Sequence, residues 1–83
     1  MVVKKVERDP YFEKLFSKLD NNQREKVKTQ IRKIISNPEV GKPMQYSRKG
    51  TRELYSGSFR LSYAYILEEN KVIFLDLYHK DKQ

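Results

Sequence analysis

The hydrophobic pattern of this chain of 83 residues changes its period once, near Gly41. Before that glycine, apolar residues recur every three or four positions, as on one face of a helix. After it they alternate with polar residues, as along a strand that buries one face. Helices grouped early and strands grouped late predict an α+β fold, in which an antiparallel sheet carries a helical hairpin on one face.

Two helices are expected in the first half. Asp9-Pro10 is typical of a helix start, with an aspartate as N-cap and a proline at the first helical position. Asp20 ends this helix and caps the next one, where Gln23 completes a capping box. The second helix ends near Asn37-Pro38, because the residue before a proline avoids helical geometry. So short a connection predicts an antiparallel pair.

Strands are expected on both sides of the helices, in the order β-α-α-β-β-β. The first is short and lies around residues 2–6, and the later ones span residues 52–55, 58–67 and 72–78. Met44 to Ser47 is a short strand or an extended loop, and Arg48-Lys49-Gly50 is a turn.

The register of the last hairpin decides which side chains meet. A turn over residues 68–70 would pair Leu61 with Leu77 and Tyr63 with Leu75 on the face that the helices cover. The same register would pair Arg60 with Tyr78, Ser62 with Asp76 and Ala64 with Phe74 on the other face. We prefer it because it gathers the apolar residues. A turn shorter by one residue would pair Arg60 with His79.

Size and composition indicate a single domain over residues 1–83. There is no cysteine, so nothing points to an oxidising compartment. No apolar run approaches the roughly 20 residues of a membrane span, and no signal peptide precedes the first strand, so we expect a cytoplasmic protein. Lys and Arg number 18 against 11 Asp and Glu, a net charge of +7. That balance favours a polyanion, nucleic acid before membrane, or an acidic protein partner.

Arg60 is the leading candidate for a functional residue. It lies in a strand, on the face opposite Phe59 and Leu61, and its planar guanidinium suits a phosphate. The alternative is an ion pair with Asp76 that only stabilises the sheet. His79, the single histidine, is a candidate general acid or base, because histidine is the residue type best suited to proton transfer near neutral pH, with surface decoration as its alternative.

Other candidates are basic or aromatic residues around Arg60. Glu53 is the only carboxylate near the basic cluster and a weaker candidate base. One histidine and no cysteine exclude a His/Cys metal cluster. The predicted nucleic-acid contacts are phosphate-binding cations and aromatic side chains that stack on bases: Arg48, Lys49, Arg52, Lys80, Lys82, Tyr46, Tyr55 and Tyr78.

Three segments together resemble the RelE/ParE toxin superfamily. They are Asn37 to Met44, with the pattern NPxxGKP, then Gly50 to Tyr63, and finally Leu77 to Lys80. The resemblance covers nearly the whole chain, because the helical hairpin and the strand order match as well. Glu53 and Tyr55 stand where some RelE members carry lysines, and Lys80 stands where many carry arginine.

The resemblance implies the toxin of a type II toxin–antitoxin pair. RelE-like members are ribosome-dependent endoribonucleases that cut mRNA in the A site by attack of a 2′-OH on the adjacent phosphate. They use no metal, and the resemblance implies no cofactor and no small-molecule ligand. By position, Arg60 would stabilise the phosphate, His79 would move a proton, and Lys80 would complete the catalytic set.

The implied partners are the ribosome, mRNA and an acidic, RelB-like antitoxin, with no membrane. Two alternatives stay open at this stage. One is a ParE-like toxin that inhibits DNA gyrase without nuclease activity. The other is an inactive relative that binds only its antitoxin or nucleic acid.

Overall fold

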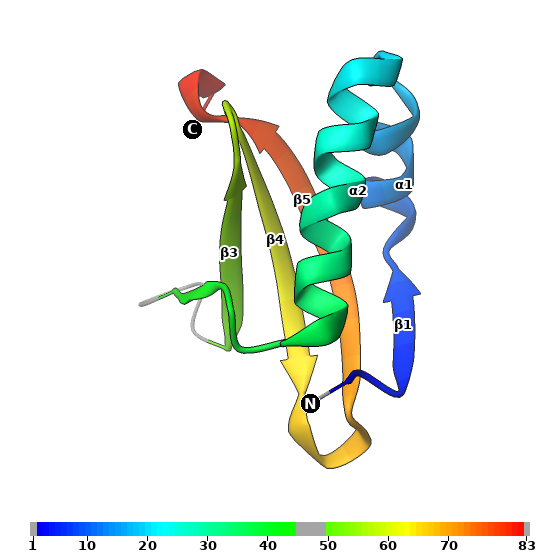
Figure 1. The fold of residues 1–83 in the computed structure, drawn as a ribbon, viewed down its shortest axis with the longest axis vertical. Coiled ribbons are helices and arrows are strands. Elements are labelled where there is room, and N and C mark those ends of the chain that lie inside the picture. Colours follow the sequence, from blue (N-terminus) through cyan, green and yellow to red (C-terminus); the bar gives the residue numbers. More distant parts are fainter. Residues whose placement is uncertain (1, 45–49, 83) are drawn as a thin grey trace.

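The computed structural model describes residues 2–44 and 50–82, which form two helices on one five-stranded sheet (Figure 1). The strands lie in the order β1-β5-β4-β3-β2. Within the described residues, no helix is both long enough and apolar enough to cross a bilayer. In chain order the elements are β1 (Lys5–Arg8), α1 (Pro10–Ser17), α2 (Asn21–Ser36), β2 (Lys42–Pro43), β3 (Thr51–Ser56), β4 (Phe59–Ile66), the 3₁₀ turn η2 (Leu67–Glu69), β5 (Lys71–His79) and the 3₁₀ turn η3 (Lys80–Lys82).

Both helices begin at the caps that the sequence predicts. The Asp9 carboxylate accepts a hydrogen bond from the Tyr11 amide at 2.9 Å, and Pro10 opens α1. Asp20 and Gln23 form the reciprocal capping box of α2, with bonds of 2.8 and 3.2 Å. These bonds satisfy amide groups that a helix start otherwise leaves without partners.

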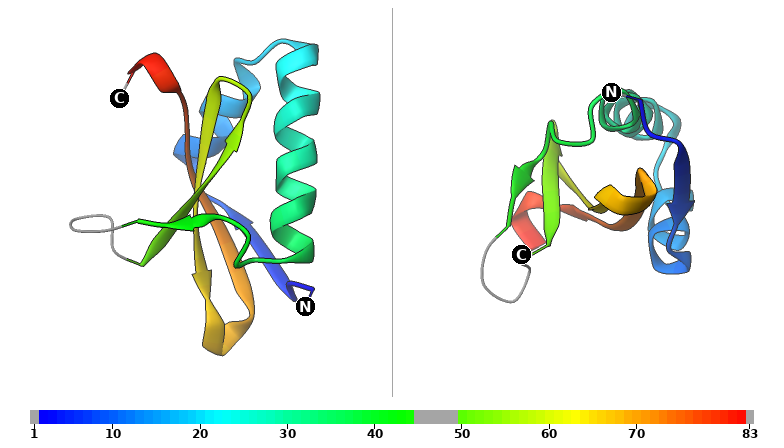
Figure 2. Two further views of the ribbon diagram at one scale, coloured as in Figure 1. Left: turned by 60° about the vertical axis from the view of Figure 1, so that its left-hand side comes forward. Right: turned by 90° about the horizontal axis from the view of Figure 1, so that it is seen from below.

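The core lies between the helical hairpin and one face of the sheet (Figures 1 and 2). Phe12 of α1 stacks on Phe74 of β5 with 5.5 Å between ring centroids. The α2 side chains Val27 and Ile34 are fully buried. The predicted α+β class, with a helical hairpin on one sheet face, is confirmed.

The sheet is mixed, which corrects the expectation of a purely antiparallel one. β1 pairs with β5 in the parallel sense, and Val6 lies opposite Val72. β1 occupies residues 5–8, slightly later than the predicted 2–6. Alternation along a strand reports which face is buried but not the direction of its neighbour, so the sequence pattern could not reveal this pairing.

The last hairpin contains a β-bulge, so the predicted register is right on one side of the bulge and wrong on the other. Leu61 pairs with Leu77 as expected, but Tyr63 pairs with Phe74 and not with Leu75. The hairpin loop holds four residues, because Ile66 pairs with Lys71. The bulge lies between Ser62 and Tyr63, where the register shifts by one residue. Because of this shift, Phe74 and Leu77 are both buried in the core.

Candidate functional site

Alternation along the strands gives the sheet one face under the helices and one face that no described helix covers (Figure 2). Directly opposed residues of antiparallel strands share a face. The strand registers place a cluster of polar and aromatic residues on the uncovered side. We call this cluster the open face, and its members are Lys42, Glu53, Tyr55, Arg60, Ser62 and Tyr78.

Arg60 lies at the centre of the open face, between Tyr55 on β3 and Tyr78 on β5. Its guanidinium carbon is 4.1 Å from the centroid of the Tyr55 ring, in cation–π contact. The Arg60 Nε is buried and has no hydrogen-bond partner within the described part of the chain. The guanidinium is therefore stacked on Tyr55, and no described residue accepts a hydrogen bond from its Nε.

Glu53 sits beside Arg60 as a buried carboxylate, with only 3% of its surface exposed. The Tyr78 hydroxyl donates a short hydrogen bond to Glu53 Oε2. Ser62 Oγ donates to the same oxygen at 3.3 Å. Three neighbouring strands thus hold one carboxylate against the phenol of Tyr78.

The proposed scaffold pair between Arg60 and Asp76 does not form among the described residues. The Asp76 carboxylate instead accepts the Leu77 amide at 2.7 Å, next to the bulge. The carboxylate that the sequence suggested as a structural partner of Arg60 is therefore hydrogen-bonded to the backbone next to the bulge.

His79 lies on the opposite face of the sheet from Arg60, although the sequence analysis grouped the two. It is paired with Phe59 across the strands, and the two rings meet edge to face at 5.5 Å. Its Nδ1 accepts the Asp81 amide at 3.2 Å. The reason is strand alternation: Tyr78 faces Arg60, so the next residue points to the helix side. His79 is therefore not a member of the open face that holds Arg60.

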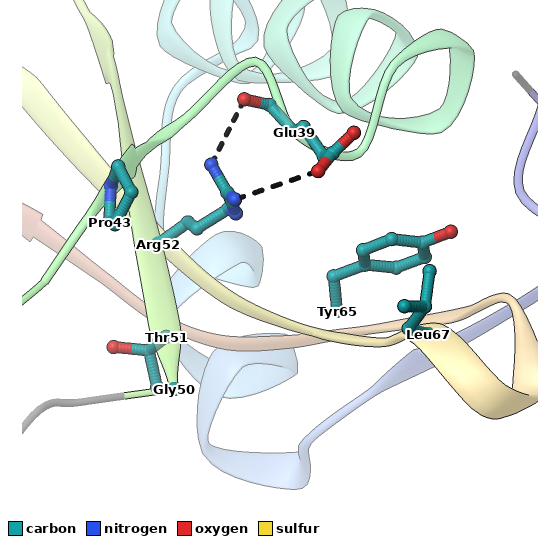
Figure 3. A pocket seen from close by; sticks show the side chains of 7 residues that line it. All are labelled: Glu39, Pro43, Gly50, Thr51, Arg52, Tyr65 and Leu67. Atoms are coloured by element: carbon teal, nitrogen blue, oxygen red, sulfur yellow. Dashed lines mark hydrogen bonds and ion pairs between the residues drawn. The ribbon is translucent and has the colours of Figure 1, made fainter.

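Arg52 is also on the helix-covered side, where it supports the segment after α2 (Figure 3). Its Nη1 donates to the carbonyls of Glu39 and Gly41 at 3.0 and 2.8 Å. Its Nη2 is 4.0 Å from the Glu39 carboxylate. These contacts engage the guanidinium of Arg52 with the segment between α2 and β2. The structure therefore does not favour the predicted contact of Arg52 with a phosphate.

Of the remaining predicted cations, Lys80 and Lys82 lie in η3, directly after β5. Lys80 is exposed in η3, and its amide donates to the Ser58 carbonyl at 2.8 Å. Lys82 closes η3. Arg48 and Lys49, together with Tyr46, lie outside the described residues. Among the described residues, no three His, Asp or Glu side chains gather into a metal site.

Lys42 is the member of the open face that sequence reasoning missed. It lies opposite Glu53 because β2 pairs with β3. Alternation along the strand predicted that Glu53 and Tyr55, two residues apart on β3, lie on the same face. A strand of two residues carries no alternation, so nothing in the sequence signalled Lys42.

Comparisons with solved structures identify the fold. A chain of the toxin–antitoxin complex RelBE2 from Mycobacterium tuberculosis superposes with a TM-score of 0.84 at 25% identity, covering 94% of this chain and 99% of that one. The isolated Escherichia coli RelE toxin superposes with a TM-score of 0.76 at 22% identity, covering 90% and 82%. The RelE–RelB complex from Pyrococcus horikoshii gives a TM-score of 0.74 at 11% identity, covering 99% and 100%.

No family model and no curated protein sequence matches the chain, so the assignment depends on the structure. The structural matches extend over nearly all of this chain and, in two of the three cases, over nearly all of the matched chain. The agreement therefore extends over the fold as a whole. This chain therefore has the fold of the RelE toxins, which supports its resemblance to the RelE-like toxin superfamily.

Proposed function

We propose that the protein is the toxin of a type II toxin–antitoxin system and acts as an endoribonuclease on ribosome-bound mRNA. The reaction is attack of a 2′-OH on the adjacent phosphate, without a metal ion. Arg60 binds the scissile phosphate and stabilises the negative charge that grows on its oxygens. Lys42 and Lys80, at the two edges of the site, attract the neighbouring phosphates.

The observation that carries this proposal is the state of Arg60. A guanidinium stacked on Tyr55, without an ion-pair partner in the described residues, is suited to a bidentate anion. Tyr55 is 52% exposed and offers a ring on which a base can stack beside that anion. Phosphate and base are the two repeating features of RNA.

The partners follow from charge and from the structural neighbours. A net charge of +7 favours both the ribosome, with its RNA, and an acidic antitoxin. The neighbours from Mycobacterium tuberculosis and Pyrococcus horikoshii come from complexes of toxin with antitoxin. An antitoxin that folds on the open face would neutralise the toxin by covering the positive charges there.

Expression from a tightly controlled promoter, followed by mapping of mRNA 5′ ends on ribosomes, tests the proposal. We expect codon-phased cuts with the wild-type chain and none with Arg60→Ala. Arg60→Lys keeps the charge but loses the fork, and should reduce cutting by about tenfold or more. The matched control is Arg32→Ala, which removes an exposed arginine on α2 and should cut like the wild type.

Two results would overturn the proposal. One is growth arrest with DNA damage and intact mRNA, which is the outcome for a gyrase inhibitor. The other is unchanged cutting by Arg60→Ala, which would show that the open face is not the site.

A further inference from the structure

We infer that Arg52 is the positioning residue for Lys42. From the helix-covered side of the sheet, it holds the segment after α2 in the register that puts Lys42 on the open face. The inference rests on the proposed function, in which Lys42 attracts a phosphate of the RNA. It gives Arg52 a part in RNA binding without any contact between Arg52 and RNA.

β2 has few contacts of its own that could fix its register against β3. It holds only Lys42 and Pro43, and a proline has no amide hydrogen to donate to a neighbouring strand. The next amide, that of Met44, donates to the Thr51 carbonyl at 3.0 Å. A strand that slips by one residue turns each of its side chains to the other face of the sheet. The face on which Lys42 lies therefore depends on contacts outside the strand ladder.

Arg52 supplies such contacts from β3. Its Nη1 donates to the carbonyls of Glu39 and Gly41, which are two residues apart, at 3.0 and 2.8 Å. Figure 3 shows the guanidinium directed at Glu39, and the Arg52 side chain is only 25% exposed. Hydrogen bonds from a charged donor are stronger than those between neutral groups. One nitrogen that bridges two carbonyls at this spacing fixes where the segment lies along β3, immediately before Lys42.

Tyr63 supports the same segment from β4 and carries no charge. Its hydroxyl accepts the Gly41 amide at 2.9 Å, while Arg52 binds the Gly41 carbonyl. Both backbone polar groups of the residue before Lys42 are thus held by side chains of the neighbouring strands. Lys42 then lies opposite Glu53, on the open face.

A double-mutant cycle on the binding of a short single-stranded RNA to the full chain tests the inference. Lys42→Gln removes one phosphate contact and should lower the slope of log affinity against log salt by about 0.7. Arg52→Met loses every donor of the side chain and should lower this slope by a similar amount, although Lys42 is still present. In the Lys42→Gln background, Arg52→Met should change the slope no further, because a positioning residue acts only through the residue that it positions.

A structural readout and an uncharged variant separate positioning from a loss of charge or of fold. The Met44 amide should exchange its hydrogen faster in Arg52→Met than in the wild type, because its bond to β3 is lost with the register. Tyr63→Phe changes no charge and should lower the slope in the same way. Arg32→Met removes an exposed arginine of α2 and is the matched control, which should keep the wild-type slope and exchange rate. Thermal unfolding shows whether each variant is folded at the temperature of the measurement.

The outcomes distinguish the positioning role from the proposed function. If Lys42→Gln lowers the slope and a folded Arg52→Met does not, the positioning role is wrong and the function stands. An equal effect of Arg52→Met with and without Lys42 also overturns it, because Arg52 would then act on RNA directly, and so does unchanged exchange of the Met44 amide. If neither Lys42→Gln nor Arg60→Gln changes the slope, RNA does not bind the open face, and the proposed function fails together with the inference.

Discussion

Tyr63 links the core of the sheet to the segment that follows α2. It is fully buried, and its hydroxyl donates to the Pro38 carbonyl at 2.7 Å and accepts the Gly41 amide at 2.9 Å. A Cβ built on Gly41 would lie 2.6 Å from this hydroxyl, closer than atoms can approach. The glycine of the NPxxGKP pattern is therefore required by contact with a tyrosine 22 residues later.

Tyr63→Phe should destabilise the protein by about 2–3 kcal/mol, because it leaves a buried amide and a buried carbonyl without partners. Burial raises the pKa of Tyr63, an effect larger than the lowering by the Gly41 amide. A raised pKa favours the neutral form in the folded state, so this contribution is complete below the ordinary pKa of 10.0 and is lost as pH rises above it. Urea unfolding at neutral pH and above about pH 10 measures both effects.

The variant should lose less stability on alkaline titration than the wild type does. Tyr11→Phe is the control, since Tyr11 is 56% exposed and should leave the alkaline slope unchanged. Equal slopes for wild type and Tyr63→Phe would contradict the assignment. Lys71 also has a raised pKa, through its hydrogen bonds to Glu7 and Glu69, and loses that contribution in alkali, but it is present in every variant compared.

Among the elements, α2 depends most clearly on its cap. Its exposed positions carry many lysines and arginines, and its first turn holds no acidic residue to interact with the helix dipole. The capping box of Asp20 and Gln23 supplies the missing negative charge and two hydrogen bonds. The helix start is thus fixed by local chemistry, which explains why sequence reasoning located it.

Asp20→Ala should cost about 1 kcal/mol of folding free energy, because the Gln23 amide loses its acceptor. Asp20→Ser keeps an acceptor oxygen and should recover most of that loss. Denaturation midpoints in urea compare the two. A serine variant as unstable as the alanine variant would show that the cap hydrogen bond is not the cause.

For the whole molecule, the sheet separates two chemical environments. The covered face holds the apolar core, together with Arg52 and His79, whose polar atoms are engaged by nearby backbone. The open face holds Arg60, the Glu53–Tyr78 pair and Lys42. Net charge alone favours neither surface for RNA, whereas the pairing of the strands gathers Arg60 and Lys42 on the open face and supports the proposal that RNA binds there.

The salt dependence of binding to a short single-stranded RNA tests this division. Each phosphate contact contributes about 0.7 to the slope of log affinity against log salt. Arg60→Gln and Lys42→Gln should each reduce the slope by about that amount. Arg32→Gln, which removes an equal charge from the helix side, should leave it unchanged, and equal effects of all three would mean diffuse binding with no preferred face.

The sequence by itself determined the local features, because their causes lie within a few residues. The two helix caps, the end of α2 before Pro38 and the alternation that puts Arg60 opposite the core all follow from neighbouring residues. The Arg60–Tyr78 pairing was also predicted, since the bulge restores the register beyond it.

Only the tertiary structure decided how distant segments meet. The parallel pairing of β1 with β5, the placement of Lys42 beside Glu53 and the capture of Arg52 by the Glu39 and Gly41 carbonyls join residues that no local pattern relates. The face of His79 depended on which of the two hairpin registers forms, because a shift of one residue moves a side chain to the other face of the sheet. The physical reason is that periodicity fixes the face of each strand, while partner, direction and register are set by packing of the whole chain.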